Sequence, residues 1–314
     1  MKLEELATEI TELFTQADLA EPRREMRLFL REIAGLELAE QLRKPDLTIS
    51  VDESNHLRRL ARRRAKREPL AYIKGQAWFY GRSFLIEPGL MVPRPDSEIL
   101  IEAALLELTQ STIGERLLLL DSCCGTGCLG LTLLAELQAD RKAKLHLLDS
   151  SRTAIEVATR NAARLGLETA VTYEQADLWP KSSRERENEK FDVILCNPPY
   201  IASNEIAGLM PEVRDHESHL ALDGGADGLD FYRRIAAGYR DYLKPEGLLI
   251  LELGAGQADA VTDIFNLMAD QSQFSKQDVS LEKMPSYAKR REDRLKFYRD
   301  YNGYERSLVV RGYT

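Results

Sequence analysis

The stretch FDVILCNPPY, residues 191–200, decides how this chain folds. Residues 191–196 are apolar apart from Asp192, which is typical of a parallel strand buried on both faces of a sheet. Two prolines end the run, because proline donates no N–H to a sheet and forces the preceding residue into an extended conformation. Asn197 and Pro198 are therefore expected at the carboxyl end of the strand, the edge where open α/β sheets bind ligands.

The NPPY residues place two hydrogen-bond acceptors together, the side-chain oxygen of Asn197 and the carbonyl oxygen of Pro198. Together they match both hydrogens of an –NH2 group, whose nitrogen lone pair then points out of the plane towards a donor. The Tyr200 ring offers a negative face to the positive charge that develops as the nitrogen attacks. The pattern predicts a site that holds an amine or amide. The plainer alternative is a strand-ending Pro-Pro turn with an exposed tyrosine.

Strands alternate with helices around this stretch, which is the pattern of a parallel sheet. The sequence predicts strands over residues 117–121, 144–149, 171–175, 191–196, 248–253 and 307–310, and helices over 128–138, 151–165 and 228–242. Before residue 71 only helical patterns occur, and from Tyr72 to Pro93 aromatic and β-forming residues with glycines indicate a hairpin. We expect an α/β chain with a helical domain over 1–73, a β-hairpin linker over 74–93 and a third part over 94–314.

The glycine loop at residues 125–130, GTGCLG, matches the G-x-G-x-x-G pattern of dinucleotide sites, with Asp149 further along. Asp121, however, ends the strand before the loop. A carboxylate there repels a pyrophosphate and attracts the ammonium group of a methionine moiety. Asp149 can accept both ribose hydroxyls, and Asp177 can accept from an adenine amine. The set fits S-adenosylmethionine better than NAD.

Composition narrows the class of protein further. The formal net charge of −8 disfavours broad binding to a nucleic-acid backbone. No apolar run reaches membrane-spanning length, and MKLEELATEI lacks the apolar core of a signal peptide, so we expect a cytoplasmic protein. The four cysteines lack the paired spacing of a zinc site, so we expect reduced thiols and no metal.

Two further groups of charged residues each have two interpretations. The basic cluster of residues 58–67 is either a solvated helix end or a docking face for an acidic or RNA-bearing partner. In VPRPDSE, residues 92–98, Arg94 and Glu98 either line the mouth of the ligand site or only cap the helix that Pro95 opens.

Longer motifs resemble the HemK-type protein-(glutamine) methyltransferases, especially the bacterial release-factor branch. The resemblance covers nearly the whole chain and rests on EPLAYIKG (68–75), FYG (79–81), VPRPDSE (92–98), the D-x-x-x-G-T-G loop, NPPY, and VRDHESHLALDGGADGLDFYRRI (213–235). It implies a small helical domain that recognises the substrate protein, joined by a β-hairpin to a seven-stranded, Rossmann-like class I methyltransferase domain. It also implies methyl transfer from S-adenosylmethionine to the glutamine amide nitrogen in the Gly-Gly-Gln loop of class I peptide-chain release factors. Separately, we expect a monomer.

The resemblance also implies roles for individual residues. Asn197, Pro198 and Tyr200 are the expected catalytic residues, and Pro199 walls the pocket. The resemblance implies cofactor contacts at Cys123, Cys124, Gly125, Thr126, Gly127, Asp149, Leu178 and Asn197, and substrate contacts at Asn197, Pro198, Pro199 and Tyr200. The reasoning from the residues adds Asp121 and Asp177 as expected cofactor contacts, and adds Arg94 and Glu98 as expected substrate contacts if they line the mouth of the site.

Two departures from the family pattern concern the cofactor. Cys123 stands where the family usually has glycine, and Cys124 stands where threonine is common. A side chain at residue 123 crowds the methionine carboxylate if the backbone there needs a positive φ. Leu178 replaces the aromatic residue often found next to the adenine.

Three other functions remain open at this point. A sister branch methylates a glutamine of a large-subunit ribosomal protein. DNA adenine methyltransferases hold an exocyclic amine with the same motif, but base flipping needs a recognition domain and a basic groove. A cofactor-binding but inactive scaffold is the third, although a scaffold has no need of two acceptors in NPPY.

Overall fold

The computed structural model describes residues 1–138, 141–181, 190–271 and 294–312. Its backbone forms two compact units. The N-terminal unit comprises Met1–Ala77, Ile86–Gly89 and Leu209–Glu217, and the C-terminal unit comprises Trp78–Leu85, Leu90–Gly208 and Ser218–Thr314. The domain boundaries expected from the sequence, after residues 73 and 93, do not anticipate that residues 209–217 belong with the N-terminal helices.

The N-terminal unit is helical, as predicted. Its helices are α1 (Leu3–Gln16), α2 (Pro22–Ala34), α3 (Leu38–Arg43), α4 (Val51–Ala65), α5 (Leu70–Lys74) and α9 (Pro211–Arg214), of which the short α3, α5 and α9 were not expected. The apolar stripe of α1 packs on α2 and α4, and Phe14 meets Phe29 edge to face with ring centroids 5.9 Å apart. The Ser50 hydroxyl begins α4 by accepting the Glu53 N–H. This core gives the unit a fold of its own.

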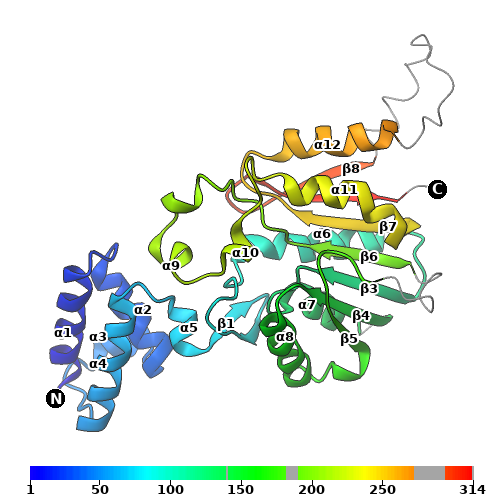
Figure 1. Ribbon diagram of the computed structural model, residues 1–314. Helices are drawn as coiled ribbons and strands as arrows, with labels where there is room; N and C mark the ends of the chain where they lie inside the picture. Colours follow the sequence, from blue (N-terminus) through cyan, green and yellow to red (C-terminus); the bar gives the residue numbers. More distant parts are fainter. Residues whose placement is uncertain (139–140, 182–189, 272–293, 313–314) are drawn as a thin grey trace. The chain divides into compact units, whose positions relative to one another are not determined.

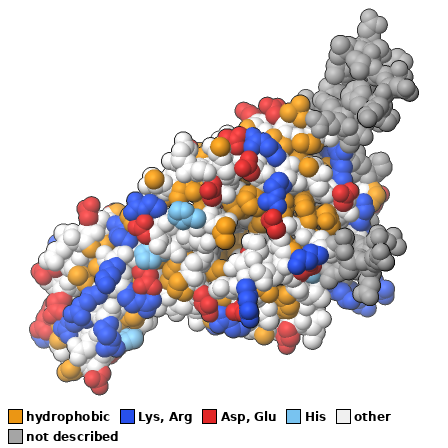
Figure 2. All heavy atoms as spheres, viewed as in Figure 1, with side chains coloured by type: hydrophobic (Ala, Val, Ile, Leu, Met, Phe, Trp, Pro, Cys, Tyr) orange, Lys and Arg blue, Asp and Glu red, His pale blue; other side chains and the backbone are white. Residues whose placement is uncertain are grey.

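Most of the basic cluster is paired inside the N-terminal unit. The ion pairs are Arg58 with Glu9, Arg63 with Glu68, Arg64 with Glu25 and Glu212, and Arg67 with Glu212. Figure 2 shows basic and acidic side chains next to one another over this part of the chain. Neither interpretation of the cluster anticipated these pairs.

Arg64 is the buried member of the cluster. Its side chain is 9% exposed and lies 2.6 Å from Glu25 of α2 and 2.9 Å from Glu212 of α9. Arg67 contacts the second Glu212 oxygen at 2.8 Å. These pairs hold residues 209–217 to the N-terminal helices, so Arg64 serves as a clamp rather than as part of a docking face.

We expect Arg64→Ala to lower the free energy of unfolding by about 3 kcal/mol, because the half-buried Glu25 carboxylate loses its ion-pair partner and the Glu212 carboxylate keeps only Arg67. Urea titration of the full chain, followed by far-ultraviolet circular dichroism, measures the loss. Arg62→Ala is the matched control: Arg62 is exposed and has no ion pair within the described ranges, so a change below about 0.5 kcal/mol is expected. Equal losses in the two variants would contradict the clamp.

A tight hairpin follows α5. Strands β1 (Gln76–Phe79) and β2 (Arg82–Leu85) pair with each other, and the two loop residues Tyr80 and Gly81 have φ values of 49° and 71°. Two positive φ angles define the type I′ turn, whose twist matches that of the flanking strands. The predicted hairpin is confirmed, although it is shorter than the stretch from Tyr72 to Pro93.

The C-terminal unit is built on one seven-stranded sheet in the order β5-β4-β3-β6-β7-β9-β8. The strands are β3 (Arg116–Ser122), β4 (Lys142–Asp149), β5 (Val171–Gln175), β6 (Phe191–Cys196), β7 (Leu243–Glu252), β8 (Leu295–Arg299) and β9 (Glu305–Arg311). The first five in this order are parallel, and β9 is antiparallel to both β7 and β8. The predicted fold class is confirmed, whereas β8 and the early start of β7 were not predicted.

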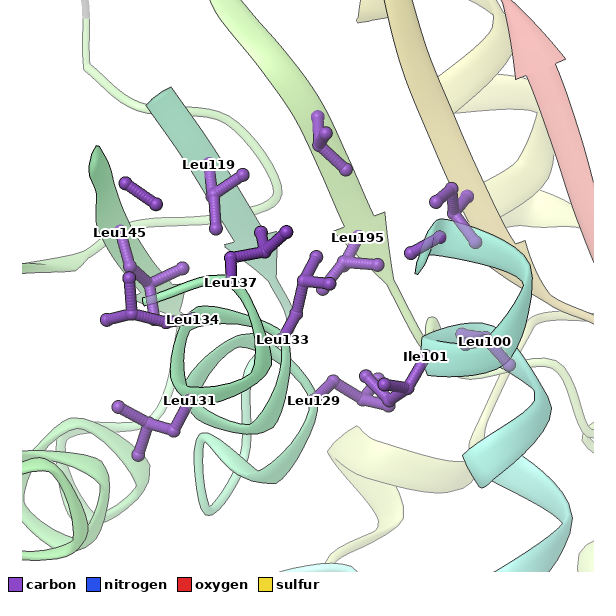
Figure 3. Packing of buried hydrophobic residues seen from close by; sticks show 14 of the residues in the cluster. Leu100, Ile101, Leu119, Leu129, Leu131, Leu133, Leu134, Leu137, Leu145 and Leu195 are labelled. Carbon is purple, nitrogen blue, oxygen red and sulfur yellow. The ribbon is translucent and has the colours of Figure 1, made fainter. Parts of the chain in front are cut away.

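Helices cover both faces of this sheet, as Figure 1 shows. The helices are α6 (Glu98–Thr109), α7 (Cys128–Leu137), α8 (Arg152–Arg164), α10 (His219–Leu222), α11 (Asp230–Tyr242) and α12 (Ala258–Gln271). Leucines of α6 and α7 meet Leu119, Leu145 and Leu195 on one face (Figure 3), and α11 and α12 cover the other. Alternate residues of β6 enter the two cores, which explains its continuous apolar run. No helix of the described parts is long and apolar enough to cross a bilayer.

The strand order reverses between β3 and β6. From β3 the chain continues to β4 and β5 on one side, then returns to build β6 and β7 on the other. In open α/β sheets such a switch point leaves a crevice at the carboxyl ends of the strands, where ligands bind. The NPPY residues follow β6 and the glycine loop follows β3, so both sequence motifs flank this switch point.

Candidate active site

The NPPY residues keep both predicted acceptors available. Asn197 is half-buried, and its side-chain nitrogen lies 4.0 Å from the Met91 sulfur. Among the described residues, nothing donates to the Asn197 side-chain oxygen or to the Pro198 carbonyl. Because a buried acceptor ordinarily has a partner, two unused acceptors beside a proline-terminated strand are suited to a ligand that brings N–H groups.

Tyr200 is fixed at both its backbone and its ring. Its carbonyl accepts from the Gln257 side chain at 2.9 Å, and its hydroxyl donates to Glu252 at 3.2 Å. Burial and the nearby Glu252 charge hold the pKa of the Tyr200 hydroxyl well above its ordinary value, so it stays a donor. The ring is therefore a fixed neutral wall at the end of the motif.

The loop between β3 and α7 has an unusual backbone. Cys123, Gly125 and Gly127 have φ values of 59°, 54° and 77°, and Gly127 begins α7. For Cys123 a left-handed conformation costs about 1 kcal/mol, which glycine would avoid. The structure thus places a side chain at a positive-φ position, the condition under which crowding of a cofactor is expected.

Asp121 is a fully buried carboxylate at the end of β3. One oxygen accepts the Gly130 N–H at 2.8 Å, and within the described ranges the other has no hydrogen-bond partner. Gly130 permits this approach, since a Cβ there would lie 2.8 Å from the Asp121 Cβ. Burial, with a smaller effect of Asp149, raises the pKa of the Asp121 carboxyl to about 7. An unpaired buried carboxylate is suited to a cationic group of a ligand.

Asp149 joins β4 to the same loop. One of its oxygens accepts the Gly125 N–H at 2.9 Å and the other accepts the Ser151 N–H at 2.8 Å. Burial raises the pKa of its carboxyl. Each carboxylate oxygen can accept more than one hydrogen bond, so Asp149 retains capacity for two hydroxyl groups.

Comparison with known proteins adds to this geometry. Residues 98–225 match the family model of the methyltransferase small domain, and residues 5–75 match the PrmC N-terminal domain. The release factor glutamine methyltransferase of Rhodospirillum rubrum is 37% identical over 88% of this chain and 81% of its own. That of Geobacter sulfurreducens is 38% identical over 74% of this chain and 77% of its own.

The chain belongs to the release factor glutamine methyltransferase family. Among solved structures, the hMettl16 catalytic domain superposes with a TM-score of 0.52 at 12% identity over 91% of each chain, a likeness that concerns the fold alone. Family membership and the NPPY geometry rest on separate observations, and the catalytic role of the NPPY residues stays a prediction.

Two predicted cofactor contacts of this family member lie on the loop after β5. Leu178 is buried with a φ of 64°, and its carbonyl accepts from the Ser122 hydroxyl at 2.5 Å, which ties this loop to β3. Asp177 is exposed, and its carboxylate pairs with Arg234 at 2.8 Å. A role for Asp177 as an adenine acceptor stays a prediction, and it requires the carboxylate to serve Arg234 as well.

Glu98 and Arg94, the two predicted site residues of the PRPDSE stretch, differ in their surroundings. Glu98 accepts the Tyr80 N–H at 2.7 Å and so supports the hairpin turn. Arg94 is half-buried, and its charge lowers the pKa of Tyr200, which places it within electrostatic reach of NPPY. Substrate contacts of either residue stay predictions.

Glu252 and Gln257 are the residues around Tyr200 that the sequence analysis missed. Glu252 is buried at the end of β7, and burial raises the pKa of its carboxyl to about 7. Its signal was present in the sequence, because a carboxylate closes the apolar run of β7 as Asp121 and Asp149 close β3 and β4. For the cysteines, burial raises the pKa of the Cys124, Cys128 and Cys196 thiols, and none of the four is in a disulfide.

The Asp121 carboxyl makes stability depend on pH. Its pKa is raised in the folded state, so the native chain retains a proton that the unfolded chain releases, and stability is lost as pH rises towards 7. We compare the free energy of unfolding of Asp121→Asn with that of the native chain. The difference in favour of the variant is expected to increase by about 3 kcal/mol from pH 5 to pH 8. Urea titrations at both pH values test this. Asp259→Asn, at an exposed helix position, serves as control, and a similar growth there would refute the assignment.

Proposed function

We propose that this protein transfers a methyl group from S-adenosylmethionine to the side-chain amide nitrogen of the glutamine in the Gly-Gly-Gln motif of class I release factors. Membership of the release factor glutamine methyltransferase family supports the reaction class. The observation that carries the proposal is the pair of unused acceptors at Asn197 and Pro198, which matches the two N–H groups of a primary amide.

The chain's own residues orient and enclose the amide. Asn197 and Pro198 accept hydrogen bonds from its two N–H groups and so orient the amide with its out-of-plane nitrogen lone pair towards the methyl donor. Pro199 and Tyr200 wall the pocket, and the ring faces the positive charge that develops on nitrogen. The cofactor supplies an electrophilic methyl group on a sulfonium. Once alkylated, the nitrogen is acidic enough to lose its extra proton to water, so no general base is required.

We assign the cofactor to the ends of β3, β4 and β5. The free Asp121 oxygen suits the methionine ammonium, and Asp149 suits the ribose hydroxyls. Cys123, Cys124, Gly125, Thr126 and Gly127 form the loop beside them, and Leu178 with Asp177 provides the adenine side. The Asp121→Asn variant expected to stabilise the fold is also expected to weaken cofactor binding, because it removes the charge that the ammonium meets.

We also infer a cytoplasmic, monomeric protein. Its release-factor substrates work on ribosomes, and the four cysteines are free, as is usual where thiols stay reduced.

The first experiment is mass spectrometry of a purified class I release factor after incubation with this protein and S-adenosylmethionine. A single methyl increment on the Gly-Gly-Gln peptide is expected. A large-subunit ribosomal protein and a DNA duplex serve as parallel substrates. Methylation of either one, with the release factor unmodified, would replace the proposal by that activity, and cofactor binding without any methylation would favour the scaffold.

A single substitution tests the amide holder. We expect Asn197→Ala to lower kcat at least a hundredfold, since one of two orienting acceptors is lost, while cofactor affinity changes little. Kinetics with the release factor and calorimetric titration with S-adenosylmethionine measure the two effects. Asn204→Ala, at an exposed residue seven positions further along the chain, is expected to be neutral. Unchanged turnover in Asn197→Ala would rule out the holder.

A further inference from the structure

Glu252 is a buried carboxylate that the proposed reaction does not use. It is the last residue of β7 and is 1% exposed. The neighbouring Leu251 is in register with Cys196, the last residue of β6, so the end of β7 lies beside the NPPY residues. One Glu252 oxygen accepts the Tyr200 hydroxyl at 3.2 Å, and the Ser97 hydroxyl is a second polar group close to the buried carboxylate. Burying such a group costs free energy, so a role is expected.

The hydrogen bond of the Tyr200 hydroxyl fixes the direction of this hydroxyl, which the backbone contacts of Tyr200 do not determine. Gln257 holds the Tyr200 carbonyl and accepts the Gly254 N–H at 3.0 Å. A Cβ on Gly254 would lie 2.4 Å from the Gln257 oxygen and 3.0 Å from the Tyr200 ring, so glycine allows both to pack there. These contacts place the tyrosine backbone, whereas the direction of its hydroxyl depends on Glu252.

We propose that Glu252 is a positioning residue for methyl transfer, whose ionised carboxylate fixes the Tyr200 hydroxyl and so holds the ring against the substrate amide. The inference rests on the proposed function of the NPPY site. A phenol that donates to a carboxylate also has a more electron-rich ring, which strengthens its attraction for the positive charge developing on nitrogen. Protonation of Glu252 removes both effects and slows transfer.

The groups around Glu252 come from every element that packs against it. Tyr200 follows β6, Tyr232 of α11 donates to the Glu252 backbone carbonyl at 2.9 Å, and the Cys128 thiol of α7 senses the Glu252 charge. The Ser97 hydroxyl, then Arg306 of β9 and the Tyr200 hydroxyl, lower the pKa of Glu252, whereas Asp96, in the 3₁₀ turn Pro95–Ser97, raises it. Burial dominates and brings this pKa to about 7, while the pKa of Tyr200, Tyr232 and Cys128 is raised.

Asp121 titrates in the same range but affects a different kinetic constant. Its carboxyl, also with a pKa of about 7, is assigned to the cofactor ammonium, so its protonation raises the KM for S-adenosylmethionine. Glu252 acts on the transfer step and therefore on kcat. Measurement at saturating cofactor and saturating release factor separates the two groups.

The test is a pH profile of kcat between pH 6 and pH 8.5. The native chain is expected to gain about tenfold through an inflection near pH 7, the difference between a neutral and a charge-assisted hydrogen bond. Glu252→Gln keeps an acceptor without the charge, so its kcat stays low and flat. Tyr200→Phe is flat too, and adding Glu252→Gln to it causes no further loss. Glu246→Gln, exposed on the same strand, keeps the native profile.

Two results would overturn the inference: an inflection that persists in Glu252→Gln, or a full additional loss when Glu252→Gln is added to Tyr200→Phe. A second measurement does not depend on the substrate. In protein labelled with ¹³C-tyrosine, the Tyr200 Cζ signal, assigned by its absence in Tyr200→Phe, is expected to shift near pH 7 in the native chain and not in Glu252→Gln. If the native chain shows the shift near pH 7 but methylates no release factor, only the proposed function is disproved. If the native chain shows no shift, the Glu252 contact is disproved.

Discussion

Burial of β6 on both faces is the constraint on which the rest of the structure depends. Because its side chains pack into both hydrophobic cores, the strand must lie in the middle of the sheet, and helices must cover it on either side. Its two prolines then stop the hydrogen-bond ladder at the switch point beside β3. The unused Pro198 carbonyl follows directly, because the backbone has left the sheet where no neighbouring strand can donate to it, and the Asn197 side chain stands at the same strand end.

The carboxyl edge of the sheet concentrates acidic groups at a cost in stability. Asp121, Asp149 and Glu252 end β3, β4 and β7, and burial raises the pKa of all three. In the proposed function, a partner group offsets the cost of burying each carboxylate. The partner is an ammonium group for Asp121, two hydroxyls for Asp149 and the Tyr200 hydroxyl for Glu252. Such a site lowers the free energy of unfolding but favours recognition, which is common where binding needs a charge already in place.

The sequence predicted those features that depend on local pattern. The ranges of β5 and β6 agree with the prediction: β6 is a short apolar run that ends at prolines, and β5 begins with the β-forming residues Val171, Thr172 and Tyr173. The strand β8 was missed although Asn302-Gly303 is a turn signal, because its five residues keep the apolar alternation only from Leu295 to Phe297. Arg64 with Glu212, and Tyr200 with Glu252, were missed because each pair joins residues far apart along the chain, and no local spacing encodes such a contact.

The clamp on residues 209–217 has a consequence for biosynthesis. Arg64 and Glu212 are separated by 148 positions, so the N-terminal helices leave the ribosome long before their last segment exists. At ordinary rates of synthesis the interval is about 7 to 30 seconds. During it, Arg64 and Arg67 lack the Glu212 carboxylate, and the first unit waits in an incomplete form. Vectorial folding therefore cannot finish the two units one after the other, and completion of the first is tied to synthesis of the stretch that follows the NPPY residues.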